Sequence, residues 1–179
     1  MGFLKGKTAI ITGGGRSVLK DGSCGSIGYG IATAYAKEGA NLVITGRNKQ
    51  KLADAKEELE RLYNIEVLPV QADVSAGADN ETVVQNVIDE TIAKFGRIDV
   101  LINNAQASAS GVAANEWGPD GINTNIICPL AWTAQLENFQ QTYPEAFEAN
   151  VKMPPAGHYG DVEKEIGRVC VPVSYTHLT

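Results

Sequence analysis

The chain has 179 residues, and its 15 lysines and arginines stand against 21 aspartates and glutamates, which gives a formal net charge of −6. The hydrophobic share of 44% and the charged share of 20% are ordinary for a soluble globular domain and argue against a disordered chain. The acidic balance argues against a nucleic-acid partner and against an anionic membrane surface, because both require clustered Lys and Arg. No run approaches the roughly 20 apolar residues of a membrane-spanning helix.

The cysteines and the amino terminus indicate the compartment. Cys24, Cys128 and Cys170 form no C-x-x-C pair, which predicts free thiols in a reducing environment rather than a disulfide framework. The opening MGFLKGKTAIITGG contains no uninterrupted apolar stretch with a cleavage site, so no secretory signal is predicted. We therefore expect a single cytoplasmic domain, without internal repeats or a linker.

Predicted strands and helices alternate through the first part of the chain. Short apolar runs bounded by turn residues predict strands at 8–12, 41–45, 67–70 and 98–102. Helical spacing predicts helices at 29–39, 49–63 (after an N-cap at Asn48) and 79–95. The expected buried face of helix 49–63 consists of Leu52, Ala55, Leu59 and Leu62. That of helix 79–95 consists of Val83, Val84, Val87, Ile88 and Ile92. This alternation predicts an α/β fold with a doubly wound parallel sheet, and Pro69 suggests an edge strand.

The alternation ends after Asn103. The apolar run 122–128 predicts one further strand, and helices are expected near 134–141 and 161–171, with irregular structure between them. The 19 residues from 103 to 121 exceed the dozen or so that a parallel crossover needs. We therefore expect the β-strand order 3-2-1-4, followed by strand 122–128.

The first strand leads into a glycine-rich turn, Thr12-Gly13-Gly14-Gly15-Arg16, and Ser26-Ile27-Gly28 then opens a helix. Glycines let the backbone approach a pyrophosphate closely, and free N–H groups at a helix start favour its charge. The pattern predicts dinucleotide binding by the following residues: Gly13, Gly15, Arg16, Ser26, Ile27 and Gly28. The alternative is a long flexible connection that binds nothing.

The end of the second strand indicates which dinucleotide binds. An NAD site usually has Asp or Glu there, whereas this chain has Gly46 and Arg47. Guanidinium groups at Arg16 and Arg47 suit a 2′-phosphate, so NADP is favoured over NAD. The alternative is that Arg47 is merely a solvated side chain near a helix start.

Taken together, these motifs resemble the short-chain dehydrogenase/reductase family. The matching segments are 12–16, 26–32, Asp73-Val74, Asn103-Asn104-Ala105, Ala114–Gly118, Gly121-Ile122-Asn123 and Pro129–Thr133. The resemblance implies a truncated Rossmann-like fold in which Asp73 and Val74 border the adenine, Asn104 and Ala105 border the adenosine ribose, and Thr133 borders the nicotinamide. Asp73 as a turn residue and Asn103-Asn104 as a strand-end cap are the structural alternatives.

The resemblance has two departures in the cofactor half. Residues 17–25 are an insertion, after which Ser26 replaces the family's middle glycine, and Gln106 replaces the glycine of Asn-Asn-Ala-Gly. The sequence Ser-Ile-Gly-Tyr-Gly-Ile-Ala at residues 26–32 resembles the enoyl-thioester reductase branch of the family. Added loop length costs little closure entropy, so cofactor binding stays compatible with the insertion.

The third departure concerns catalysis. The family's reaction uses a Ser and a Tyr-x-x-x-Lys pair, yet none of the six tyrosines has a Lys four residues on. Tyr159 comes nearest, but Lys164 would lie about 140° away around a helix. Residues 113–117 resemble the end of the helix that carries the Tyr-x-x-x-Lys pair in the family. The resemblance therefore implies that a helix, the fifth strand and most of the catalytic helix are missing at the Val112–Ala113 junction. No catalytic residue is assigned.

The sequence thus divides into a cofactor-binding half (1–112), a remnant of the catalytic half (113–171) and an unrelated tail (172–179). By resemblance the reaction is hydride transfer between NADPH and a carbonyl/alcohol or enoyl substrate, and we expect this chain to be catalytically impaired. The alternatives are an enzyme with another proton donor such as Tyr159, a non-catalytic dinucleotide-binding protein, or a non-functional gene fragment.

The remaining expectations concern partners. The missing helices resemble the family's subunit interface, so a monomer or weak oligomer is expected rather than the family's tetramer, and the small-molecule substrate is not predicted. His158 and His177 lack metal-ligand spacing, so no metal is predicted. Residues 153–157 fall where the family's substrate lid would lie; the alternative is a rigid surface loop.

Overall fold

The computed structural model describes residues 2–74, 79–105, 127 and 129–173. The described elements are β1 (Thr8–Thr12), α1 (Ile27–Lys37), β2 (Asn41–Gly46), α2 (Lys49–Tyr63), β3 (Val67–Gln71), α3 (Asn80–Phe95), β4 (Val100–Ile102), α5 (Ala134–Thr142), α6 (Pro144–Asn150), the π-helical turn η3 (Val162–Gly167) and α7 (Arg168–Val173). Of the expected strand 122–128 only Ile127 lies inside the described residues, so that strand stays a prediction.

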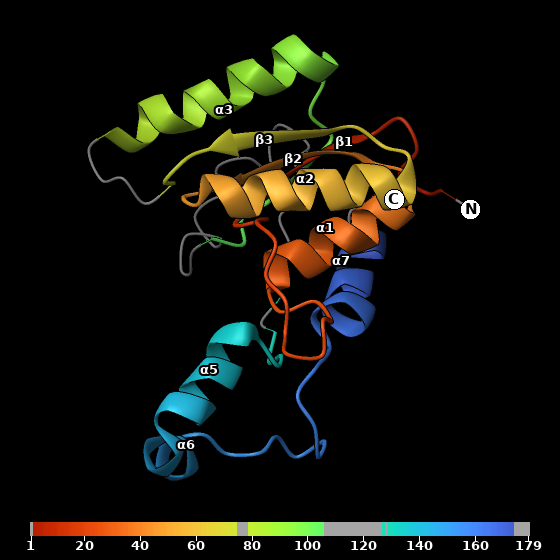
Figure 1. Ribbon diagram of the computed structural model, residues 1–179. Helices are drawn as coiled ribbons and strands as arrows, with labels where there is room; N and C mark the ends of the chain where they lie inside the picture. The colour runs from red at the N-terminus through yellow and green to blue at the C-terminus, as the bar shows by residue number, and fades with distance from the viewer. Residues whose placement is uncertain (1, 75–78, 106–126, 128, 174–179) are drawn as a thin grey trace, which may run out of the picture.

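The sheet has the predicted strand order. The four described strands pair in parallel as β3-β2-β1-β4, with Ile10 opposite Val43 on one side and Leu101 on the other. Figure 1 shows α1 and α2 over one face of the sheet and α3 over the other. The doubly wound α/β fold is therefore confirmed, with parallel strands covered on both faces.

The two faces of the sheet are packed unequally. Alternate residues of the central strands point into a large core under α1 and α2, whereas Ile10, Val43 and Val70 face a small core shared with Val87 of α3. The predicted buried face of α3 is wrong in part, because Val84 is 39% and Ile92 is 46% exposed. Leu62, predicted on the buried face of α2, is likewise 48% exposed. Helical periodicity identifies an apolar face, but it does not say how much of that face another element covers.

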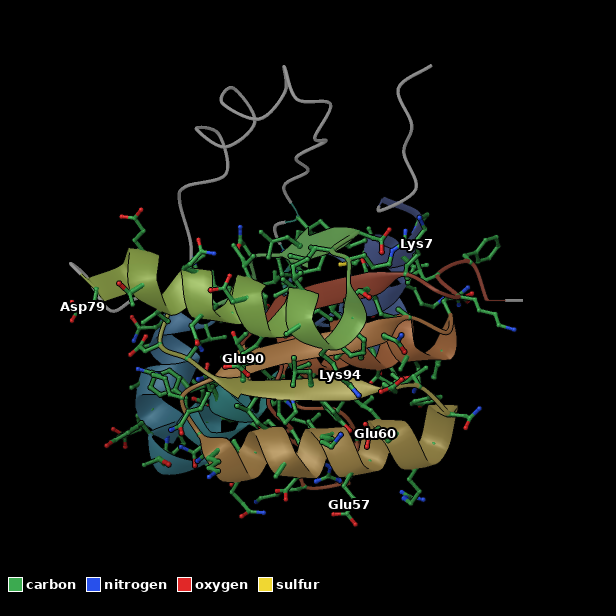
Figure 2. All side chains as sticks on the ribbon, turned by 90° about the horizontal axis from the view of Figure 1, so that it is seen from above. Lys7, Glu57, Glu60, Asp79, Glu90 and Lys94 are labelled. Atoms are coloured by element: carbon green, nitrogen blue, oxygen red, sulfur yellow. The ribbon has the colours of Figure 1, made fainter. Side chains whose placement is uncertain are left out.

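The edge strand β3 is protected by charged side chains of α2. The Val67 N–H donates to Glu60 Oε1 at 2.9 Å, and Lys56 Nζ donates to the Val67 carbonyl at 2.8 Å. Lys94 of α3 lies beside β3 (Figure 2) and forms an ion pair with Glu66, the residue before that strand. Charged groups on backbone atoms of an edge strand hinder pairing with another chain, which fits the edge position that Pro69 predicts.

The second half differs from expectation in its helices. The expected helix near 134–141 is α5, but α6 was not predicted, although Pro144 at its first turn favours a helix start. Residues 162–173 form η3 and α7 instead of one α-helix, and Asp161 caps η3 by accepting from the Glu163 and Lys164 N–H groups at 2.9 and 2.7 Å. Figure 1 shows α7 beside α1, while α5 and α6 lie apart from the sheet.

Asp99 joins the start of β1 to the segment before β4. Its carboxylate accepts from the Thr8 N–H at 2.9 Å, from Lys7 Nζ at 3.1 Å and from Arg97 Nε at 2.7 Å. Burial alone would raise the pKa of Asp99, but these donors outweigh it and hold the pKa below the usual value. The carboxylate therefore stabilises the fold above the ordinary aspartate pKa near 4, and this contribution is lost as the pH falls through the lower pKa of the folded state.

We expect Asp99→Asn to lower the free energy of unfolding by about 1–2 kcal/mol near neutral pH, because three donors lose a charged acceptor. Below about pH 4 the free energy of unfolding should also fall less steeply in the variant than in the wild type, because the variant has no carboxylate to protonate at this position. Urea denaturation across this pH range measures both effects. Asp89→Asn is the matched control, since Asp89 is exposed and its carboxylate accepts from Gln85 at 2.8 Å. Equal losses in the two variants would contradict this role of Asp99.

Candidate dinucleotide-binding site

The predicted site residues follow the carboxyl ends of the strands. Gly13 follows β1, Arg47 follows β2, Asp73 lies two residues after β3, and Asn104 lies two residues after β4. Because the four strands are parallel, these ends share one edge of the sheet, where ligands of doubly wound sheets bind. The Ala72 N–H donates to the Gly46 carbonyl at 3.1 Å, which ties the Asp73-Val74 segment to the end of β2.

Thr12, the last residue of β1, holds the segment after β4 in place. Its hydroxyl oxygen accepts from the N–H groups of Asn104 at 3.0 Å and Ala105 at 2.9 Å, and the hydroxyl donates to the Ile102 carbonyl at 3.3 Å. The Asn104 side-chain amide in turn donates to the Thr12 carbonyl at 2.9 Å. Thr12 was not among the predicted site residues. The signal that could have identified it is a hydroxyl residue at the end of a buried strand.

The start of α1 lies directly on the glycine turn. A Cβ on Gly28 would be 2.3 Å from the Gly13 carbonyl oxygen and 2.6 Å from Asn104 Nδ2, so only glycine fits there. Gly13 itself has φ +71°, a conformation that glycine adopts without strain. The turn, the helix start and Asn104 therefore lie together.

The first turn of α1 is not capped by a side chain. Ser26 occupies the N-cap position, but its hydroxyl makes no capping hydrogen bond and instead donates to the Gly15 carbonyl at 3.3 Å. The amide groups at the start of α1 thus have no side-chain acceptor from the N-cap, and these groups favour an anion. Ile27, the first residue of α1, is partly buried beside them.

The insertion 17–25 forms a short antiparallel hairpin. The Leu19 N–H donates to the Ser23 carbonyl at 2.9 Å, and the Gly25 N–H donates to the Ser17 carbonyl at 2.8 Å. The Ala134 N–H donates to the Gly25 carbonyl at 2.8 Å, and the Lys20 N–H donates to Glu137 at 3.2 Å. These contacts place Thr133, the N-cap of α5, next to the hairpin and so near Ser26.

The two predicted arginines lie in different surroundings. Arg16 forms an ion pair with Glu58 of α2, and the Glu58 carboxylate raises the pKa of the guanidinium. Arg47 is exposed, and its carbonyl accepts from the Gln71 side chain at 3.0 Å. Within the described part of the chain, the arginines that lie within 4.0 Å of a carboxylate are Arg16 and Arg97. Sequence analysis missed Glu58, because nothing in the local pattern of α2 links it to the glycine turn.

Other predicted features are only partly described. Gln106, the motifs at 114–118 and 121–123, the Val112–Ala113 junction, Cys128, His177 and most of the 172–179 tail lie outside the described residues. Cys24 is a free thiol, and burial raises the pKa of Cys24 and of Cys170 to about 11 each. The Tyr159 phenol donates to the Lys152 carbonyl at 2.9 Å, and its ring lies 5.5 Å from that of Trp132.

Neither a metal cluster nor a membrane span is found in the described part of the chain. No three or more of its His, Cys, Asp and Glu side chains form a group that could hold a metal ion. None of its helices combines the length and the apolar content that crossing a bilayer requires.

Comparison with known sequences adds a family and two kinds of relative. A family profile described as short chain dehydrogenase matches residues 7–113. A 12α-hydroxysteroid dehydrogenase of a Clostridium species is 46% identical over an alignment of 241 residues, which covers 96% of this chain and 90% of that protein. A peroxisomal 2,4-dienoyl-CoA reductase of Arabidopsis thaliana is 34% identical, over 68% of this chain and 36% of the reductase.

Solved structures share the architecture. L-sorbose reductase from Gluconobacter frateurii, complexed with NADPH and L-sorbose, matches with a TM-score of 0.76 and 19% identity, over 98% of this chain and 94% of that chain. At this identity the likeness establishes the fold alone. A short chain dehydrogenase from Mycobacterium smegmatis matches with a TM-score of 0.51 and 29% identity, over 66% of this chain and 46% of that chain.

Proposed function

We propose that this chain, which belongs to the short-chain dehydrogenase family, is an oxidoreductase that binds NADP at the carboxyl edge of its sheet. The observation that carries the proposal is the contact between Gly28 and Gly13, where a Cβ would lie 2.3 Å from the Gly13 carbonyl oxygen. Together with the uncapped start of α1, it provides a backbone surface that fits a pyrophosphate.

The residues at this edge fit the parts of the cofactor. Gly13, Gly15, Ser26, Ile27 and Gly28 would hold the pyrophosphate. Asn104 and Ala105 would contact the adenosine ribose, Asp73 and Val74 the adenine, and Thr133 the nicotinamide end. When bound, the nicotinamide supplies or accepts the hydride for a carbonyl/alcohol or enoyl substrate.

We propose NADP rather than NAD because Arg47 follows β2 as an exposed cation, where an NAD site would have a carboxylate. Arg47→Gln should weaken NADPH binding by about tenfold or more and leave NADH binding nearly unchanged, since only NADPH carries the 2′-phosphate. Isothermal titration with both cofactors measures the ratio. Arg61→Gln removes an exposed cation in the last turn of α2 and should leave the ratio of NADPH to NADH affinity unchanged. A similar ratio in both variants would argue against the NADP assignment.

We further propose that turnover is impaired, because no Tyr-x-x-x-Lys pair occurs in the chain. The steroid dehydrogenase alignment of 241 residues is longer than this chain of 179, which supports a missing internal segment. A positioned proton donor contributes roughly 10²–10⁴-fold to rate, so turnover should fall by about that factor relative to the steroid dehydrogenase. The alternative of a non-catalytic protein gains no support from these relatives, which are enzymes by name.

The experiment pairs binding with turnover. NADPH oxidation is followed with a 12-oxo steroid and with a 2,4-dienoyl thioester, and the Clostridium enzyme serves as the positive control. We expect NADPH to bind and to be oxidised far more slowly than in the control, with the steroid as the favoured substrate class. Turnover equal to that of the control, abolished by Tyr159→Phe, would show an intact enzyme with another donor. Absence of NADPH binding would overturn the function proposed here.

A further inference from the structure

Arg16 is attached to α2 by both its backbone and its side chain. The Arg16 N–H donates to the Lys51 carbonyl at 2.8 Å, in the first turn of α2, and the guanidinium pairs with Glu58, two turns further along the helix. Glu58 lies about 15 Å along the helix axis from the N-cap Asn48. The Arg16 guanidinium therefore points along α2 and away from Arg47, which precedes that N-cap.

The Arg16–Glu58 ion pair is partly shielded from water. The exposed fractions of the two side chains are 32% and 28%, and the Tyr29 side chain beside them is 4% exposed. Burial, and then the Glu58 carboxylate, raise the pKa of the Tyr29 phenol, which keeps it neutral. If Arg16 turned towards a 2′-phosphate, Glu58 would remain partly buried without its cation, and leaving a shielded charge unpaired is unfavourable.

The attachment extends to the pyrophosphate surface through Gly15. The Gly15 carbonyl accepts from the Ser26 hydroxyl at 3.3 Å, and a Cβ on Gly15 would lie 3.2 Å from the Lys51 Cβ. The glycine turn is thus fitted closely between α2 on one side and the start of α1 on the other. A displacement of Arg16 from α2 would move Gly15 and, through it, Ser26.

We propose that Arg16 is a positioning residue whose ion pair with Glu58 holds the glycine turn against α2, and that selection of the 2′-phosphate rests on Arg47 rather than on Arg16. This inference rests on the dinucleotide site proposed above. It separates two arginines that sequence analysis treated as equivalent ligands, and it makes Glu58 a determinant of affinity for both cofactors.

The first test compares affinities for NADPH and NADH. Arg16→Gln and Glu58→Gln should each weaken the binding of NADPH and of NADH by the same factor, about twofold to tenfold. The ratio of the two affinities should stay unchanged. The charge-reversed pair Arg16→Glu with Glu58→Arg should recover most of the lost affinity, because it restores the attachment. Glu57→Gln makes the same charge change on the outer face of α2 (Figure 2) and should have no effect. A selective loss of NADPH affinity in Arg16→Gln would show that Arg16 binds the phosphate and would overturn the inference.

The second test needs no cofactor. Glu58→Gln should accelerate tryptic cleavage after Arg16 and Lys20, because the turn is no longer held to α2, whereas Glu57→Gln should be cleaved at the wild-type rate. Equal cleavage rates in the two variants would overturn the inference. Faster cleavage in Glu58→Gln, combined with no NADPH binding by the wild type, would instead refute the proposed function while leaving the attachment of Arg16 established.

Discussion

Gly28→Ala is expected to abolish NADPH binding and to lower the free energy of unfolding by about 3 kcal/mol, the upper part of the range for overpacked sites. The added Cβ would meet the Gly13 carbonyl oxygen at 2.3 Å and Asn104 Nδ2 at 2.6 Å. The first obstacle is backbone and cannot rotate away, so the start of α1 must separate from the end of β1. That movement would break the surface proposed for the pyrophosphate.

Thermal unfolding with and without NADPH measures both parts of this prediction. Added NADPH should raise the stability of the wild-type protein, because a ligand that binds only the folded state stabilises it. It should not raise the stability of the variant. Gly46→Ala is a control for stability, because the nearest atom to its Cβ would be Leu52 Cδ2 at 3.6 Å, an ordinary van der Waals contact. A Gly28→Ala protein with wild-type stability and the wild-type NADPH response would refute both the packing argument and the site.

Thr12→Val should lower the free energy of unfolding by about 2–3 kcal/mol, although valine has nearly the same shape as threonine. The substitution removes the acceptor of the Ala105 N–H, and it leaves the Asn104 N–H with the Ile102 carbonyl at 3.0 Å as its remaining described partner. The end of β4 would then be held less firmly against β1, and the proposed ribose contacts at Asn104 and Ala105 would loosen with it.

Thr12→Ser separates the hydroxyl from the rest of the side chain. Serine keeps the hydroxyl oxygen and loses one methyl group, so this variant should lose only about 1 kcal/mol of the free energy of unfolding. Urea denaturation followed by far-ultraviolet circular dichroism compares the three proteins. Equal stabilities of the serine and valine variants would mean that the hydroxyl contributes nothing measurable.

Local patterns predicted the cofactor half well. The strands at 8–12 and 41–46 were found within a residue of their observed ends, because short apolar β-branched runs between turn residues are a local signal. The N-cap at Asn48 is confirmed, since its side chain accepts from the Lys51 N–H at 3.0 Å. Two elements show the limit of these patterns. The strand predicted at 98–102 is confined to Val100–Ile102, and α6 was not predicted because the composition around Pro144 is mixed.

The candidate site was predictable in residue type but not in contacts. The glycines were predicted because close backbone approach needs residues without bulk, and Asn104 was predicted from the family resemblance; the structure places Gly13, Gly28 and Asn104 together. The roles of Thr12 and Glu58 were not identified, because each depends on a partner about 40 to 90 residues away. A hydrogen bond over such a separation leaves no periodic trace in the sequence.

The sequence by itself determined the alternation of strands and helices and the lack of a Tyr-x-x-x-Lys pair, because both depend on neighbouring residue types and their order. The strand order and the family were predicted from the fold pattern and the resemblance, and both are confirmed. Only the tertiary structure decided that Val84, Ile92 and Leu62 are exposed, and that Arg16 is paired while Arg47 is not among the paired arginines. Burial and charge pairing are properties of the space between elements, and that space exists only once the chain has folded.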